Sequence, residues 1–353
     1  MTSVQPDRVR SGQSSQFTAA VVDEFGSNLN VRDVDLPKPG LNQALVKLIA
    51  SGVCHTDLHA TEGDWPVKPE PPFIPGHEGI GEVIELGPGK HSVSVGDIVG
   101  NAWLWSACGD CEYCRTGRET QCNDAEYGGY TQDGSFGEYM LVDTRYAARI
   151  PEGVDYLEAA PILCAGVTVY KGLKVSETKP GQFMVVSGVG GLGHLAIQYA
   201  KAMGMRVIAV DIAEDKLDHA KEWGAEFVVN AKDEDPVQAV QAYTDGGAHG
   251  ILVTAVHRDA FGQALGMARR DGTIVFNGLP PGEFPASVFD IVFRNLTIRG
   301  SLVGTRQDMA EALDFYARGL VKPTVKECSL HEINDVFELM RQGKIDGRMA
   351  IRY

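Results

Sequence analysis

The chain has 353 residues, of which 44% are hydrophobic, so it can form two domains of ordinary size with buried cores. Its 47 aspartates and glutamates exceed its 32 lysines and arginines, which gives a net charge of −15 at pH 7. This charge repels phosphate backbones and argues against nucleic acid as a partner.

Residues 1–16 are polar, and we expect them to form a flexible extension. They lack the apolar segment of a secretory signal peptide, and no run in the chain approaches the roughly 18 apolar residues of a membrane helix. We therefore expect a cytoplasmic protein without a membrane partner. From residue 17 to about 148, short apolar runs such as QALVKLIASGVC and GIGEVIELG are separated by glycine and proline. This pattern predicts an irregular, mainly antiparallel β domain.

The pattern changes near residue 155, where YLEAAPILCAGVTVYKGL predicts a helix broken by Pro161. Strands and helices then alternate, and LGHLAIQYAKAMG is the clearest helix. This rhythm predicts a parallel, doubly wound α/β sheet. Two amphipathic helices, DMAEALDFYARGL and HEINDVFELMRQGK, are expected near the end of the chain. The strands predicted for the sheet are QFMVVSG, RVIAVD, EFVVN, GILVTAV, GTIVFNG and LTIRGSLVG.

The stretch CGDCEYCRTGRETQC contains four cysteines, at Cys108, Cys111, Cys114 and Cys122. The spacing C-x2-C-x2-C-x7-C allows four thiolates to converge on one tetrahedral ion, which favours a structural zinc with no open position. An iron–sulfur cluster is the alternative. A disulfide framework is disfavoured, because disulfide-dense chains are usually much shorter and are exported.

The stretch GVGGLG follows a predicted strand and opens a helix, and it places G-x-G-x-x-G at Gly188, Gly190 and Gly193. This context predicts a dinucleotide site, with the pyrophosphate at the helix N-terminus. Asp211, at the end of the next strand, can bind the adenosine ribose and would repel a 2′-phosphate, which favours NAD over NADP. Alternatively, Asp211 caps the following helix. Lys216 could reach the same ribose or could simply be solvated.

Cys54, His77 and Cys164 could form a zinc site with one open position, and Glu78 follows His77 directly. They are far apart in sequence, so each could instead be an ordinary core residue. Cys328 belongs to no motif, and we expect a free thiol.

These motifs (CHTDLH, GHEG, the four-cysteine loop, CAGVTVY, GVGGLG and EALDFYARGL) stand in the order found in zinc-dependent medium-chain dehydrogenases. Over residues 17–353 the chain most resembles the ethanol-type alcohol dehydrogenases of yeast and bacteria, and the polar extension is a departure from them. The resemblance implies an NAD-dependent enzyme of the EC 1.1.1.1 type that reversibly oxidises short primary alcohols to aldehydes. It also implies two zinc ions per chain and a homo-oligomer, expected to be a tetramer.

The implied domains are a GroES-like catalytic domain (residues 17–163 and 304–353) and an NAD-binding Rossmann domain (164–303). Cys54, His77 and Cys164 would bind the catalytic zinc with Glu78 behind it, and Asp57 would orient His77. Zinc would act as a Lewis acid on the bound alcohol, and hydride would pass to the nicotinamide.

Further roles are implied by position in the family. Thr56 and His59 would carry the alcohol proton to solvent. Trp65 and Trp103 would line the substrate pocket and favour small alcohols, although either indole could be core. The remaining expected cofactor contacts are His55 and Arg348 at the pyrophosphate, together with Gly191, Leu192, Val256, Leu279 and Val303.

Three other functions stay open at this point. One is a related medium-chain dehydrogenase acting on a polyol, threonine or a bulkier alcohol. Another is a non-enzymatic zinc protein that senses NAD, although such a protein needs no proton relay beside an open zinc. The third is a methyltransferase with a similar glycine turn, which would leave two zinc sites unexplained.

Overall fold

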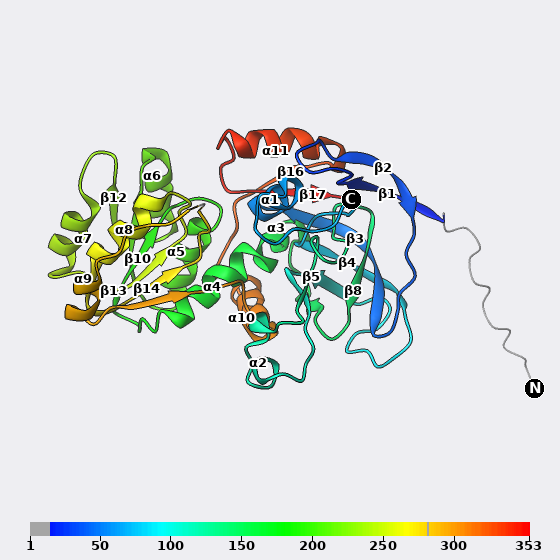
Figure 1. The fold of residues 1–353 in the computed structure, drawn as a ribbon, viewed down its shortest axis with the longest axis horizontal. Helices are drawn as coiled ribbons and strands as arrows, with labels where there is room; N and C mark the ends of the chain where they lie inside the picture. The colour runs from blue at the N-terminus through cyan, green and yellow to red at the C-terminus, as the bar shows by residue number, and fades with distance from the viewer. Residues whose placement is uncertain (1–14, 281) are drawn as a thin grey trace, which may run out of the picture.

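The computed structural model describes residues 15–280 and 282–353, which fold into two domains with helix α4 (Ala165–Val175) between them (Figure 1). Residues 1–14, most of the expected extension, lie outside the described residues. The expected extension includes residue 16, but this residue already begins strand β1 (Gln16–Val21), which pairs with β2 (Asn30–Asp35). None of the described helices is long and apolar enough to cross a membrane.

The first domain is built on an antiparallel sheet, as its short apolar runs predict. Among the described residues, seven strands form this sheet in the order β16-β17-β3-β4-β5-β9, with β8 also paired to β3. Only β16 and β17 run parallel, and β17 pairs antiparallel with β3, so the C-terminal segment completes the N-terminal domain. The strands are β3 (Gln43–Val53), β4 (Gly79–Leu86), β5 (Ile98–Asn101), β8 (Tyr139–Asp143), β9 (Ala148–Arg149), β16 (Val325–Cys328) and β17 (Arg348–Arg352).

The second domain is the predicted parallel sheet. Six strands of the described chain stand in the order β12-β11-β10-β13-β14-β15, and every neighbouring pair is parallel. The order reverses between β10 and β13, which is the switch point where dinucleotides bind in such sheets. The strands are β10 (Phe183–Ser187), β11 (Arg206–Asp211), β12 (Phe227–Asn230), β13 (Ala248–Val253), β14 (Ala268–Phe276) and β15 (Thr297–Gly300). The helices are α5 (Gly193–Ala202), α6 (Glu214–Trp223), α7 (Pro236–Thr244), α8 (Arg258–Met267) and α9 (Val288–Phe293).

The chain enters α4 through the break predicted at Pro161. Helix α3 (Tyr156–Ala159) ends just before it, and a 3-10 turn, η2 (Ala160–Leu163), carries the proline in its first turn, where a missing N–H is tolerated. Cys164 therefore lies between two helical segments rather than inside one.

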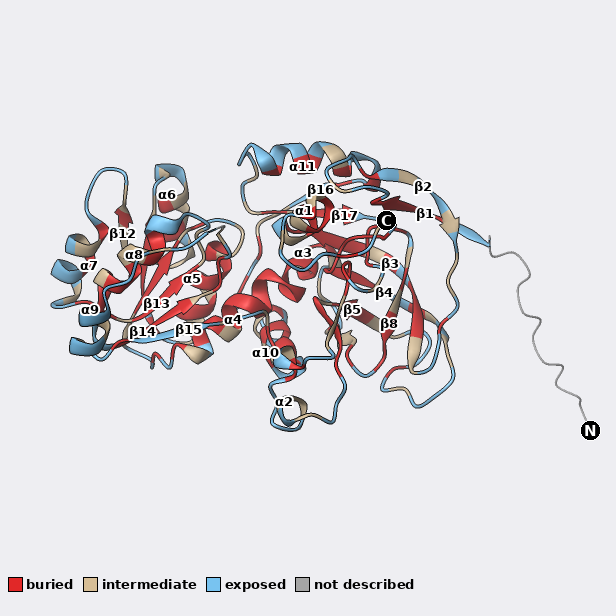
Figure 2. Ribbon diagram, viewed as in Figure 1, coloured by how far each residue is buried: buried red, intermediate tan, exposed pale blue. Residues whose placement is uncertain are grey.

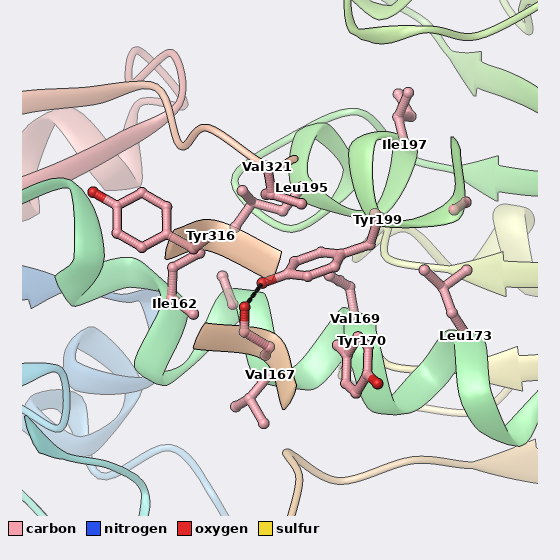
Figure 3. Close-up of a cluster of buried hydrophobic side chains, with 14 of the residues drawn as sticks. Ile162, Val167, Val169, Tyr170, Leu173, Leu195, Ile197, Tyr199, Tyr316 and Val321 are labelled. Carbon is pink, nitrogen blue, oxygen red and sulfur yellow. Dashed lines mark hydrogen bonds between the residues drawn. The ribbon is translucent and has the colours of Figure 1, made fainter. Parts of the chain in front are cut away.

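Helices α4, α5 and α10 (Arg306–Ala317) share one core (Figure 3). Leu173, Leu195 and Tyr199 are fully buried there, and the Tyr199 hydroxyl donates to the carbonyl of Ala312 at 2.9 Å. Burying a leucine completely stabilises the fold by about 1.5–3 kcal/mol. Figure 2 shows that the strands are mostly buried, while the outer faces of the helices are exposed. The joint between the domains is thus part of the core, which fixes the elements that carry the candidate site.

The remaining elements belong to the first domain, including the C-terminal segment that packs on it. They are α1 (His55–Glu62), β6 (Leu104–Ser106), α2 (Glu112–Arg115), η1 (Glu119–Gln121), β7 (Glu126–Tyr127), η3 (Leu330–Glu332) and α11 (Ile333–Arg341).

Candidate active site and metal centres

Strand pairing brings together residues that are distant in sequence. Cys54 follows the end of β3 and caps α1, while His77 and Glu78 directly precede β4. Because β3 and β4 are antiparallel with Ser51 opposite Gly79, the two ends meet. The break before α4 brings Cys164 to the same place.

The four side chains form a buried cluster whose ligand atoms lie within 4.8 Å of one another. The sulfurs of Cys54 and Cys164 are 3.9 Å apart. His77 Nε2 and Glu78 Oε2 are buried and have no hydrogen-bond partner among the described residues. Buried polar atoms left unpaired are costly, and a cation between them and two sulfurs would satisfy both. The residues therefore fit a zinc site.

Asp57 fixes the orientation of the histidine in this cluster. It is buried, and its carboxylate lies 2.7 Å from His77 Nδ1 and accepts the backbone N–H of Cys54 at 2.9 Å. The Nδ1 atom is thereby occupied, which leaves Nε2 for the cluster, as is usual for metal-binding histidines. Burial lowers the pKa of His77, but Asp57 and Cys54 outweigh burial and raise it well above its ordinary value.

The pKa values of the two thiols and the acid in the cluster shift in different directions. A hydrogen bond from Cys164 lowers the pKa of Cys54 well below its ordinary value, although burial opposes this. The bond to Cys54 and burial raise the pKa of the Cys164 thiol well above its ordinary value. Burial also raises the pKa of Glu78 to about 7, although Arg348 opposes this. A bound cation would displace the protons that remain on the ligands.

Arg348 connects the cluster to the glycine turn. It is buried and forms an ion pair with Glu78. On its other side, a Cβ placed on Gly191 would lie only 3.1 Å from Arg348 Cδ. The expected pyrophosphate contact of Arg348 is therefore compatible with its position, but its charge is also balanced by Glu78, which sequence reasoning did not foresee.

Both candidate pocket tryptophans lie on the histidine side of the cluster. The Trp103 ring is edge-on to His77 at 5.4 Å between centroids, and Trp65 is edge-on to Trp103 at 6.1 Å. Trp65 also stacks on the imidazole of His59 at 5.4 Å. The two indoles and His59 thus form a continuous aromatic wall beside the predicted metal.

The predicted proton path begins in the same helix. Thr56 lies in the first turn of α1, and His59 follows one turn later with 35% of its side chain exposed. Within the described ranges no hydrogen bond joins Thr56 and His59 directly. His59 Nδ1 lies 2.9 Å from the Asp64 carboxylate, a partner that sequence reasoning missed although Asp64 is only five residues away. His55, the first residue of α1, is exposed.

The glycine turn has the shape that a pyrophosphate needs. Gly188 has φ +98°, and a Cβ on Gly193 would lie 1.9 Å from the Gly188 carbonyl, so neither position accepts a side chain. A Cβ on Gly190 would instead meet nothing within 4 Å, so this backbone faces open space. Leu192 is the N-cap of α5.

The alternative that Asp211 caps the next helix is wrong, because α6 begins at Glu214 with Ala213 as its N-cap and receives no side-chain cap. The Asp211 carboxylate accepts the N–H of Val189 in the glycine turn at 2.6 Å, and those of Ile212 and Ala213 at 2.8 and 3.1 Å. It therefore stabilises the entry to α6 and holds the glycine turn. Asp211 remains partly exposed beside that turn, so it can still meet a ribose.

The other candidate cofactor residues follow strands at one edge of the sheet. Val256 follows β13 and is 69% exposed, and Leu279 follows β14 and is 60% exposed. Val303, after β15, has φ +41° and packs against the core of the first domain. Lys216 is half-buried on α6.

The four-cysteine loop forms a second cluster with ligand atoms within 4.8 Å. In the described ranges all seven cysteines are free thiols, and Cys328 is buried away from both clusters, in the core of the first domain. The N–H groups of Asp110 and Cys111 donate to the Cys108 sulfur and lower its pKa to about 7. Such donors stabilise a thiolate, so the loop fits the predicted structural zinc.

The loop is anchored to the fold at both ends. Glu119, buried in η1, pairs with Arg306 at the start of α10 at 3.1 Å, and the Tyr146 hydroxyl donates to the Ala107 carbonyl at 3.2 Å. A metal here would stabilise a segment that otherwise contains only α2 and η1.

Family models match two ranges of the chain. The family model described as "Alcohol dehydrogenase GroES-like domain" matches residues 40–152, and the one described as "Zinc-binding dehydrogenase" matches residues 191–318. An alcohol dehydrogenase of Moraxella sp. (strain TAE123) is 59% identical over 335 residues, which cover 95% of this chain and 99% of the relative.

Solved structures show the same fold. The alcohol dehydrogenase of the archaeon Aeropyrum pernix has a TM-score of 0.88 and 32% identity, with 95% of this chain and 100% of that chain covered. Acetophenone reductase of Geotrichum candidum, in complex with NAD, has a TM-score of 0.85 and 28% identity, with 97% and 99% covered. The predicted fold class, a Rossmann sheet with an antiparallel GroES-like domain, is thereby confirmed.

Proposed function

Because the chain belongs to the zinc-dependent medium-chain alcohol dehydrogenases, we propose that it reversibly oxidises short-chain primary alcohols to aldehydes with NAD as hydride acceptor. The observation that carries this proposal is the buried Cys54, His77 and Cys164 cluster, bordered by an indole and connected through Arg348 to the glycine turn. A polyol, threonine or a bulkier alcohol is the alternative substrate.

Two zinc ions per chain are part of the proposal. Cys54, His77 and Cys164 would hold the catalytic ion with Glu78 behind it, and the four-cysteine loop would hold a structural one. When bound, zinc supplies a Lewis acid that makes an alcohol hydroxyl more acidic, and NAD supplies the hydride acceptor. The protein itself orients the metal ligands and excludes water: Asp57 holds the His77 ring, and the residues around the cluster are buried.

The proton released from the alcohol needs a path from this buried cluster to solvent. Thr56 can accept a proton and donate its own, and the partly exposed His59 can pass one to water. Because no hydrogen bond joins these two residues among the described ranges, we propose that a hydroxyl of the cofactor ribose bridges them. The Asp64 carboxylate at Nδ1 favours the tautomer that leaves His59 Nε2 as the acceptor.

The cofactor and substrate preferences depend on single residues. Asp211 favours NAD, because a carboxylate beside the ribose repels a 2′-phosphate. Trp65 and Trp103 favour short alcohols, because two indoles beside His77 occupy the volume that a long or branched chain would need.

We also propose a homo-oligomer, expected to be a tetramer, in the cytoplasm. The edge strand β15 and helix α9 would form one contact between copies. Val288, Phe289 and Val292 on α9 are 74%, 71% and 74% exposed, an apolar surface next to an unpaired sheet edge.

A substrate panel tests the function. Purified protein would be supplied with NAD or NADP and with ethanol, 1-propanol, a branched alcohol, glycerol or threonine, while absorbance at the NADH band is recorded. We expect the highest kcat/KM with ethanol or propanol and NAD. A clear preference for glycerol or threonine would favour the alternative, and no turnover of any alcohol would refute the proposal.

A further inference from the structure

One tyrosine outside the metal cluster contacts both tryptophans. Trp65 lies in the segment after α1, and Trp103 lies between β5 and β6. The Tyr130 ring is 5.2 Å from the Trp103 ring and 6.1 Å from the Trp65 ring, between centroids. Only 5% of Tyr130 is exposed, so its ring packs inside the fold against both indoles.

The hydroxyl of Tyr130 also holds the segment that carries Trp65. It donates a hydrogen bond to the carbonyl of Val67, two residues beyond Trp65, and Val67 itself is 72% exposed. Burial raises the pKa of the Tyr130 phenol, and Asp64 raises it further, so the hydroxyl keeps the proton that it donates. The exposed segment is thereby fastened to a buried side chain.

Tyr130 is itself held in a fixed turn. The N–H of Thr131 donates to the Tyr127 carbonyl at 3.0 Å, and the Tyr127 N–H donates to the Thr131 hydroxyl at 2.8 Å. Gly129, with φ +69°, packs so closely that a Cβ there would lie 2.6 Å from Gly76. Gly76 precedes the ligand His77, so the turn that carries Tyr130 rests against the ligand segment.

We propose that Tyr130 is a specificity-determining residue, which holds the two indoles in place and so sets the size of alcohol that can reach the metal cluster. The inference rests on the proposed function, because it takes Trp65 and Trp103 as the walls of the alcohol site. Tyr130 acts through the indoles and touches no reacting atom. In a closely packed site, one extra methylene changes kcat/KM about 10- to 200-fold, so a small shift of a wall is measurable.

Two substitutions separate the roles of the ring and the hydroxyl. Tyr130→Phe removes only the bond to Val67, and Tyr130→Leu also removes the ring behind the indoles. Tyr316→Phe is the matched control: Tyr316 is 8% exposed, donates to the carbonyl of Asp155 at 3.0 Å, and lies in α10.

The measurement is kcat/KM for isobutanol divided by kcat/KM for ethanol, with NAD, together with the melting temperature of each variant. We expect this ratio to rise about threefold in Tyr130→Phe and about tenfold in Tyr130→Leu, and to stay unchanged in Tyr316→Phe. Similar melting temperatures of the two Phe variants would show that lost stability does not cause the change.

The ratio also separates failure of this inference from failure of the proposed function. If both Tyr130 variants keep the wild-type ratio while Trp103→Ala changes it, the indoles are walls but Tyr130 does not position them, and the inference is overturned alone. If Trp65→Ala and Trp103→Ala also leave it unchanged, the indoles do not border the alcohol, and the inference falls together with the proposed pocket. The proposed alcohol oxidation is overturned separately, by a wild-type protein that oxidises neither alcohol.

Discussion

Replacing Asp211 with asparagine or glycine should weaken the preference for NAD, by amounts that the contacts of Asp211 allow us to estimate. Its carboxylate accepts three backbone N–H groups, from Val189, Ile212 and Ala213. Asparagine removes the charge but keeps one acceptor oxygen. Glycine removes the charge and every acceptor, and it leaves the N–H of the buried Val189 without a partner.

Two effects add up in the cofactor preference. Hydrogen bonds from the ribose hydroxyls of NAD to the charged Asp211 carboxylate would contribute about 1.5–3 kcal/mol to NAD binding, and both substitutions weaken them. Repulsion between unit charges about 4 Å apart costs about 1 kcal/mol in water, and this cost disappears for NADP. Together they predict that the NAD-to-NADP ratio of kcat/KM falls about 100-fold in Asp211→Gly and at least about tenfold in Asp211→Asn, because about 1.4 kcal/mol is a factor of ten.

The assay is steady-state NADH or NADPH formation with saturating ethanol, accompanied by thermal unfolding. Asp211→Gly should also lose about 1–3 kcal/mol of unfolding free energy, because a buried N–H is left unpaired. Asp218→Asn is the control, since it removes the same charge from α6 at an exposed position. An unchanged cofactor ratio in both Asp211 variants, with a lower melting temperature for the glycine variant, would show that Asp211 only holds the glycine turn and the segment before α6.

Three further predictions address the pocket, the proton path and stability. Trp65→Ala and Trp103→Ala should raise kcat/KM of longer or branched alcohols relative to ethanol; an unchanged substrate order would place both indoles in the core. His59→Gln should slow oxidation about 10- to 100-fold near pH 7, less so at higher pH, with zinc retained, and pH–rate profiles equal to wild type would make His59 a bystander. Burial raises the pKa of Asp308, but Lys174 and other donors outweigh it and hold the pKa at about 2. Asp308→Asn should therefore lower the free energy of unfolding by about 2 kcal/mol at pH 7. This difference from wild type should persist above about pH 4 and disappear towards pH 2, and a difference that is the same at every pH would refute the prediction.

Elements with strong local patterns could be predicted from the sequence. The helix break at Pro161 appears as η2, and the runs predicted as parallel strands are strands β10 to β15. The run LTIRGSLVG was expected to be one strand, but β15 ends at Gly300, and Val303 has a positive φ that no strand adopts. Short helices such as α1 and α9 lack a long apolar period and were not predicted.

Contacts across the chain could not be read from spacing. His77 and Cys164 meet because β3 and β4 pair and because a helix begins after Cys164, which are properties of the folded chain. Arg348 and Glu78 are 270 residues apart, and no local signal connects them. Membership of the alcohol dehydrogenase family now excludes the methyltransferase and the non-enzymatic sensor that the motifs alone left open.

The most direct test of the central claim is the zinc content and the rate of NADH formation from ethanol, measured on the same samples of three proteins. They are wild type, Cys54→Ser and Cys328→Ser, where Cys328 is an equally buried thiol outside both clusters. We predict two zinc ions per chain and full activity in wild type and Cys328→Ser, and one zinc ion with almost no activity in Cys54→Ser. A Cys54→Ser protein that keeps both zinc ions and its activity would contradict the account.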